Sequence, residues 1–319
     1  MRGGMFLLSR ISFIVLNCKG SVNKLSNMTW FTSEHKDQGF IEAQQISARL
    51  PEILLEAQKI ASTVQTGMHG RRKQGLGDHF WQYRNYDPSA DSASRIDWRQ
   101  SARSDHLYVR EQEDERAQTA VIWLDPSAAM HYSSSSDHRT KYEYGFLLAN
   151  VLGYQLTAAG ERVECHIKQS DKVVVNHPKH MARFADILLR CPNTPYFDQR
   201  PNQTIILISD FLNQDMDTLH KMVRGLVNMR ADIHVISIFD PAEEKFSFEG
   251  HIKFEDMQAS DEFEIQDASA LKQEYETRFL DHNKQIASLV KNKNKVMSVN
   301  TARPPVDVSM RLTQMLLSF

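Results

Sequence analysis

The sequence predicts an α/β protein: a doubly wound, mainly parallel sheet with a smaller N-terminal segment packed on it. The first observation is that short, continuous apolar runs alternate with helical patterns from residue 118 onward. This alternation is typical of βαβ units with right-handed crossovers. The second is that the chain, with 319 residues of which 41% are hydrophobic and 24% charged, is long enough for one large core or two domains.

Three apolar runs predict the central strands of the sheet: "TAVIWLD" (119–125), "TIILISD" (204–210) and "ADIHVISIFD" (231–240). Uninterrupted runs of this kind are typical of parallel strands that are covered on both faces. Shorter strands are expected at 162–168, 171–176 and 296–301, and a hairpin-like stretch follows the third central strand.

Apolar residues at helical spacing predict the helices between these strands. They are expected at 141–160, 180–190, 216–230, 269–292 and 307–318. A further helix is expected over 40–66, ahead of the sheet. Pro51 lies inside it and suits a first helical turn, so this helix has an alternative start there.

The chain divides into four parts by composition: a leader (1–39), an N-terminal helical segment (40–67), a segment rich in glycine, aromatic and charged residues (68–117) and the α/β domain (118–319). The apolar run "ISFIVL" in the leader is too short to span a bilayer, which takes roughly 20 residues. We therefore expect no membrane span. The three cysteines form no CxxC pair, which favours buried, reduced thiols and a cytoplasmic protein.

Charge argues against a nucleic-acid partner. The formal net charge is −2, and acidic and basic residues balance within 68–117. A nucleic-acid surface would be clearly positive.

Within that segment, the stretch "RIDWRQSAR" (95–103) combines arginines, an aspartate and a tryptophan without a helical or strand period. Arginine forks suit carboxylates, and tryptophan stacks on guanidinium groups. Because the stretch holds no recognisable nucleophile, we favour a structural or docking latch over a catalytic loop. The latch comprises Arg95, Asp97, Trp98, Arg99, Arg103 and Arg110.

Aspartates end the three central strands, at Asp125, Asp210 and Asp240, and Ser127 follows the first by two residues. In doubly wound sheets, ligands bind outside the carboxyl ends of the strands. Oxygen ligands from two loops there can hold a hard cation such as Mg²⁺, but an aspartate after a strand also often caps the next helix. The sequence leaves both interpretations open.

Other chemical motifs are missing from the sequence. It holds no P-loop, dinucleotide fingerprint, HExxH or G-x-S-x-G motif. We therefore expect no nucleotide cofactor, name no catalytic residue and do not expect an enzyme.

A series of sequence blocks resembles the domain-of-unknown-function family numbered fifty-eight. The blocks are "GLGDHF", "YRNYDP", "RIDWRQSAR", "LYVREQEDERA" and "WLDPSAAM", in this order. The resemblance covers about residues 68–319 and implies a von Willebrand factor A-like domain. It also implies a non-enzymatic partner of a MoxR-type AAA+ ATPase that acts on unknown client proteins.

The resemblance further implies a metal-ion-dependent adhesion site, whose pattern is Asp-x-Ser-x-Ser after the first strand, a threonine in a later loop and an aspartate after the fourth strand. Asp125, Ser127 and Asp210 match this pattern, which implies Mg²⁺ as the cofactor. Ala129 replaces the second serine, and no threonine is clearly placed. The loss of an oxygen ligand weakens this expectation, because Mg²⁺ demands near-octahedral coordination. A second departure is "PSADSASRIDW", where the family has Pro-Gly-Asp before "IDW".

The leading hypothesis is an interaction protein that docks a partner on the strand-end crest around Asp125, Ser127 and Asp210. The alternative is a Mg²⁺-dependent hydrolase or nuclease that uses Asp125, Asp210 and Asp240 as a carboxylate cluster. A scaffold with a vestigial metal site is the third.

Overall fold

The computed structural model describes residues 35–69, 82–87, 93, 96–103, 106–111 and 118–317, with short gaps at 136, 169–170, 199, 213, 247–249, 251, 256–261, 266 and 293–294. The leader up to residue 34 and the blocks "GLGDHF" and "EQEDE" lie outside this description, apart from Glu111. The chain divides into two compact units: Met1–Gln65 together with Gln118–Phe319, and Thr66–Ala117.

The first unit is built on a six-stranded sheet with the order β10-β7-β6-β3-β4-β5. Neighbouring strands are parallel except β5, which runs antiparallel to β4 at one edge. This confirms the predicted doubly wound, mainly parallel α/β fold. The strands are β3 (Thr119–Leu124), β4 (Arg162–Lys168), β5 (Asp171–Val175), β6 (Gln203–Ser209), β7 (Asp232–Phe239) and β10 (Val296–Asn300).

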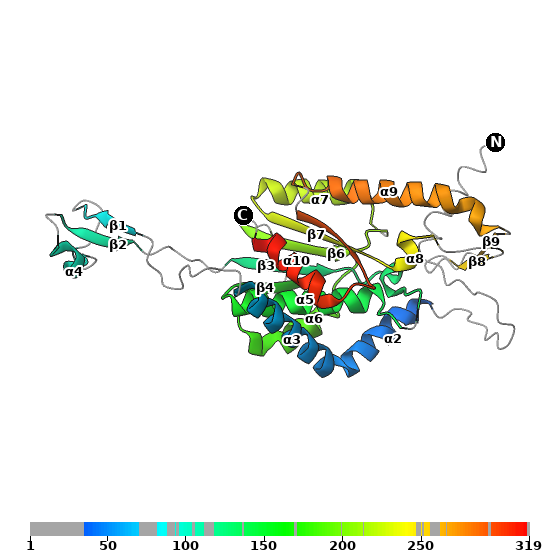
Figure 1. The fold of residues 1–319 in the computed structure, drawn as a ribbon, viewed down its shortest axis with the longest axis horizontal. Coiled ribbons are helices and arrows are strands. Elements are labelled where there is room, and N and C mark those ends of the chain that lie inside the picture. Colours follow the sequence, from blue (N-terminus) through cyan, green and yellow to red (C-terminus); the bar gives the residue numbers. More distant parts are fainter. Residues whose placement is uncertain are drawn as a thin grey trace. The chain divides into compact units, whose positions relative to one another are not determined.

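Helices cover both faces of this sheet, with α7 and α9 along one face and α5 and α6 along the other (Figure 1). The last helix, α10, packs against α5, where the Thr313 hydroxyl donates to Gln155 Oε1 at 2.9 Å. The helices are α5 (Lys141–Ala158), α6 (Met181–Leu188), α7 (Met216–Asn228), α9 (Lys272–Ser288) and α10 (Pro305–Leu317).

Short elements connect these layers. The turns η2 (Ala128–His131), η3 (Pro178–His180) and η4 (Ala268–Leu271) are 3₁₀ helices, and α8 (Pro241–Glu244) is a single helical turn after β7. The expected hairpin is formed by β8 (Ile252–Glu255) and β9 (Glu262–Ile265), which pair antiparallel.

The helix predicted over 40–66 is instead two helices, α2 (His35–Ala48) and α3 (Leu50–His69). The break falls at Arg49, and Pro51 lies in the first turn of α3, where its missing N–H costs nothing. The apolar face of these helices is buried through Ile46, Ile53, Ile60 and Val64. Among the residues that the structure describes, no helix combines the length and hydropathy that crossing a membrane requires.

The second unit contains a two-stranded antiparallel sheet of β1 (Gln82–Asn85) and β2 (Tyr108–Glu111). The short helix α4 (Trp98–Ser101) lies between these strands in the sequence. An isolated bridge joins Ile96 to Val109, and both side chains are buried.

Candidate functional site

The strand-end crest lies where the chain leaves neighbouring strands in opposite directions. From β3 the chain continues to β4 on one side, and it later returns to β6 on the other side. Asp125 follows β3 and Asp210 follows β6, so both lie at this switch point, the usual ligand position in such sheets. Both carboxylates are buried, and so is Asp240 after β7.

A buried lysine lies at the centre of the crest. Lys141, the first residue of α5, is fully buried. Its ammonium group donates to Asp210 Oδ2 at 2.8 Å and to Glu243 Oε1 at 2.6 Å. It also lies 5.8 Å from the centroid of the Tyr132 ring. We call Lys141, Asp210 and Glu243 the lysine cluster.

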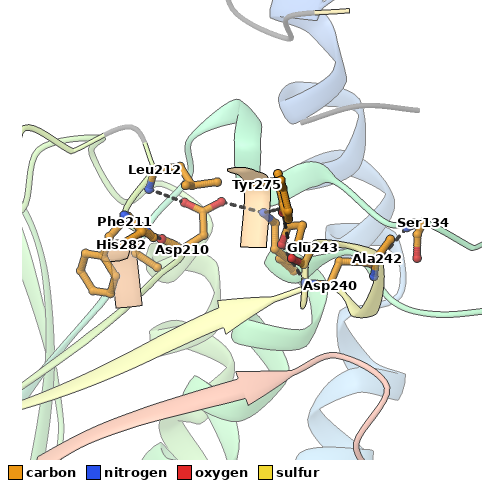
Figure 2. Close-up of polar contacts among 11 residues, drawn as sticks. Ser134, Asp210, Phe211, Leu212, Asp240, Ala242, Glu243, Tyr275 and His282 are labelled. Carbon is orange, nitrogen blue, oxygen red and sulfur yellow. Dashed lines mark hydrogen bonds and ion pairs between the residues drawn. The ribbon is translucent and has the colours of Figure 1, made fainter. Parts of the chain in front are cut away.

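The backbone and neighbouring helices hold the two carboxylates in place (Figure 2). Asp210 Oδ1 accepts from Leu212 N at 3.0 Å, and its carbonyl oxygen lies 2.9 Å from His282 Nε2 on α9. The Tyr275 hydroxyl, also on α9, donates to the carbonyl of Glu243 at 2.8 Å. The cluster therefore connects α5, α8, α9 and the loop after β6.

Asp240 has a structural role in this arrangement. Its carboxylate accepts from Ala242 N at 2.8 Å and from Ser134 N at 3.0 Å. Its own N–H donates to Glu243 Oε2 at 2.8 Å, which completes a capping box at α8. Asp240 thus follows the helix-capping interpretation that the sequence left open.

The lysine cluster keeps its cation charged. Burial by itself lowers the pKa of Lys141, but Asp210 and Glu243 outweigh it and raise that pKa above its usual value. Burial, together with the charge of Asp210, raises the pKa of Glu243 to about 7 against the opposing effect of Lys141. The ammonium therefore supplies a fixed positive charge within the crest.

Asp125 is held by two donors. Its Oδ1 accepts from Ser127 N at 2.9 Å and its Oδ2 from the Ser209 hydroxyl at 2.5 Å. Burial and the nearby Asp210 raise its pKa to about 6, although the hydrogen bonds from Ser209 and Ser127 oppose the shift. Asp125 therefore lies close enough to Asp210 for the two charges to interact.

The residues proposed to bind Mg²⁺ do not suit that ion as they are arranged. Lys141 already binds Asp210 Oδ2, and both Asp125 oxygens accept from protein donors. Ala129 supplies no side-chain oxygen, and the Ser127 hydroxyl is buried beside Asp125. Mg²⁺ requires near-octahedral oxygen coordination. One of the expected ligand oxygens, Asp210 Oδ2, already binds the positively charged Lys141 ammonium. These contacts therefore argue against the Mg²⁺ site expected at Asp125, Ser127 and Asp210.

The three carboxylates of the hydrolase alternative do not form a group that could bind one metal ion together. Within the described part of the chain, the three side chains whose ligand atoms lie within 4.8 Å of one another are Glu164, His166 and Asp198. Asp125, Asp210 and Asp240 do not make such a group. The Glu164 group is an ion-pair network at the sheet edge, because Arg200 pairs with Glu164 and Lys172 with Asp198.

The latch residues are described only in part. Asp97 caps α4 by accepting from Arg99 N and Gln100 N, both at 3.1 Å. Trp98 is 64% exposed, and the Arg99 and Arg103 side chains are exposed as well. Arg95 and the side chain of Arg110 lie outside the described residues. That the latch fixes its segment against the sheet stays a prediction.

Sequence reasoning missed Lys141 and Glu243. Lys141 lies within the predicted helix 141–160 and was assigned no role. A weak signal was available, because a lysine at the first position of a helix opposes the helix dipole and is favoured there only beside an anion. Glu243 carried no comparable signal, since acidic residues are ordinary in a first helical turn.

Comparisons with known proteins give a family and distant matches among the solved structures. None of the curated proteins matches the chain. One solved structure that does match is described as the conserved hypothetical protein BatB from Bacteroides thetaiotaomicron. The identity is 12% and the TM-score 0.35, over 63% of this chain and 100% of that chain. A likeness this distant carries no conclusion about function.

A family model matches residues 82–191 and 198–285, which is more than half of the chain. The match covers the central part of the sheet, the segment with "RIDWRQSAR" and every member of the lysine cluster. The chain therefore belongs to the family described as "Protein of unknown function DUF58".

Proposed function

We propose that this protein is a protein-interaction adaptor whose strand-end crest docks a partner protein. The lysine cluster is the observation that supports the proposal. Lys141 is neutralised by Asp210 and Glu243, and these groups are buried. A catalytic site needs charged groups that can exchange protons or ligands with a substrate. Charges that are satisfied internally instead stabilise one fixed arrangement of the crest loops.

The loop between β3 and α5 provides the exposed part of this crest. Ser134, Asp137 and His138 are exposed on it. Its base is anchored, because Ser134 N donates to the buried Asp240. The loop therefore offers polar side chains on a fixed support, which suits recognition of another protein.

The partner we propose is a MoxR-type AAA+ ATPase, with which the protein acts in the assembly or maturation of other proteins in the cytoplasm. This part of the proposal depends on the resemblance of the sequence blocks to their family.

Co-purification of the full chain with a MoxR-type ATPase from the same genome tests the proposal. It is run with and without ATP and Mg²⁺. We expect association in at least one nucleotide state, and a clear loss with Asp137→Ala combined with His138→Ala. A matched control, Arg190→Ala, removes an exposed side chain of the α6 region that pairs with Asp186 and should change nothing. Failure to associate in every nucleotide state would overturn the proposal.

A further inference from the structure

Two buried thiols lie in contact beside the β4–β5 edge of the sheet. Cys165 lies in the middle of β4, and Cys191 follows the end of α6, 26 residues further along the chain. Their sulfur atoms are 3.2 Å apart, and both cysteines are free. A disulfide joins its sulfur atoms at about 2.05 Å, so an approach of about 1 Å would bring these two to bonding distance.

The two thiols differ in their access to solvent. Cys165 is fully buried, whereas Cys191 is 6% exposed and is soon followed by the exposed residues Asn193 and Thr194. The hydrogen bond with Cys191, burial and the proximity of that thiol together raise the pKa of Cys165 well above its usual value. Because the thiolate is the reactive form of cysteine, Cys191 is the thiol that reacts first with a small oxidant, while Cys165 stays protonated beside it.

The segment that begins at Cys191 contacts the strand-end crest. The Pro192 carbonyl accepts from Trp123 Nε1 at 2.9 Å, and Trp123 lies near the end of β3. The Asn193 carbonyl accepts from Gln214 Nε2 at 3.1 Å, and Gln214 lies in the loop after β6. A change in the position of Cys191 therefore acts on contacts with the ends of β3 and β6, where the crest is formed.

The same segment is anchored to the two residues that flank Cys165 in β4. Arg200 pairs with Glu164. The Tyr196 ring lies with its centroid 6.3 Å from that of His166. These contacts hold the segment against β4 while the cysteines are reduced, and they keep the two thiols together.

We propose that Cys165 and Cys191 form a reversible disulfide when the protein meets a peroxide, and that this bond restrains the contacts between the Cys191 segment and the crest. The Cys191 sulfur attacks one oxygen of hydrogen peroxide, the O–O bond breaks, and Cys191 becomes a sulfenic acid while water leaves. The Cys165 sulfur then attacks the Cys191 sulfur and the S–O bond breaks. The departing hydroxide takes the Cys165 proton and leaves as a second water.

The reaction is balanced, because two thiols and one hydrogen peroxide give one disulfide and two waters. The peroxide is the oxidant, and a dithiol reductant reverses the step by thiol–disulfide exchange. This inference does not depend on which partner the crest binds.

Peroxide treatment of the folded full chain tests the proposal. The chain carries Cys18→Ser, so that Cys165 and Cys191 are its two remaining cysteines. The treated protein is alkylated in denaturant and its intact mass is measured. We expect the loss of two hydrogen atoms with no alkyl group added, and a cross-linked Cys165–Cys191 peptide after digestion. Dithiothreitol should restore two alkylated thiols.

The indole N–H resonance of Trp123 reports the connection to the crest. Because this group donates to the Pro192 carbonyl, we expect its NMR shift to change on oxidation and to return on reduction. The Trp98 indole, which belongs to the second unit, is the matched control and should not change. Trp123→Phe assigns the signal.

Single-cysteine variants test the order of the two steps. In Cys165→Ala, peroxide should give a sulfenic acid at Cys191 that dimedone labels. In Cys191→Ala, Cys165 should stay unlabelled, because it is fully buried. A pair that remains fully alkylatable after peroxide, oxidation of Cys191 to a sulfinic acid without the cross-link, or disulfides only between chains would overturn the proposal. An unchanged Trp123 signal in the disulfide form would overturn its link to the crest.

Discussion

Lys141 is the residue on which the arrangement of the crest depends. Its ammonium is fully buried and bound by two buried carboxylates, Asp210 and Glu243. Transfer of charges from water into a protein interior is costly, and a buried pair recovers that cost only while both partners are present. Loss of the lysine would leave two carboxylates buried side by side without a cation.

We therefore expect Lys141→Met to lower the free energy of unfolding by about 3–5 kcal/mol, the usual cost of an unpaired buried charge. Urea unfolding followed by circular dichroism measures this. Lys284→Met is the matched control, because Lys284 forms an exposed pair with Asp281 and should cost below about 1 kcal/mol. Similar losses in the two variants would contradict the role given to Lys141.

The raised pKa of Asp125 leads us to predict how the free energy of unfolding changes with pH. Burial and Asp210 raise its folded-state pKa from 3.8 to about 6. Because the folded state holds this proton more tightly than the unfolded state, the stabilisation is complete below the unfolded pKa. It is lost as the pH rises through the folded pKa. The decline from Asp125 thus falls between about pH 4 and pH 6, and amounts to about 3 kcal/mol.

Asp125→Asn should remove that decline, since the amide has nearly the same shape and does not titrate. Relative to wild type, we expect the variant to become more stable as the pH rises over this range. Chemical unfolding at a series of pH values measures the difference. Identical pH profiles for the two proteins would show that Asp125 does not titrate as its burial requires.

At the scale of elements, α5 depends on a close approach to the sheet. A Cβ added at Gly145 would lie 2.8 Å from Leu124 Cδ1, 3.0 Å from Ile238 Cδ1 and 3.2 Å from Ile208 Cγ2. The glycine therefore lets the helix approach β3, β6 and β7, which also brings Lys141 to the crest.

Two glycine substitutions separate packing from helix propensity. Gly145→Ala should destabilise by about 1–3 kcal/mol, because overpacking outweighs the better propensity of alanine. Gly225→Ala in α7 has open space around the new methyl group and should stabilise by up to about 1 kcal/mol. Thermal unfolding of the two variants measures both signs. Stabilisation by Gly145→Ala would contradict the close packing of α5.

The elements of the sheet were largely predictable because their patterns are local. The apolar runs at 119–125, 204–210 and 231–240 became β3, β6 and β7 with bounds shifted by at most one residue. The single helix over 40–66 was wrong, because its apolar spacing continues across the break at Arg49, whereas the alternative start at Pro51 lies one residue from the observed start of α3. Periodicity records which side of a helix is buried, and it does not record a change in helix direction.

The site was predictable only in part, for a physical reason. Asp125 and Asp210 could be brought together from topology alone, since both follow neighbouring parallel strands. Lys141 and Glu243 join them through tertiary contacts over sequence separations of 69 and 102 residues. No local pattern specifies such a pairing. The contact between the free thiols of Cys165 and Cys191, whose sulfur atoms lie 3.2 Å apart, could not be predicted from local patterns for the same reason.

On the scale of the whole molecule, the lysine cluster ties together elements from most of the first unit. It joins α5, the loop after β6 and α8, and Tyr275 and His282 add α9. All three of its residues lie in the first unit.

The effect of divalent cations on thermal unfolding tests most directly whether Lys141 supplies the positive charge of the crest. A ligand that binds the folded state raises the melting temperature in proportion to the logarithm of its concentration. We predict that the melting temperature of the wild-type chain is the same in Mg²⁺, in Mn²⁺ and in EDTA. A saturable rise with Mg²⁺ that disappears in Asp210→Asn would contradict the account, and would show that the crest binds a metal ion despite its lysine.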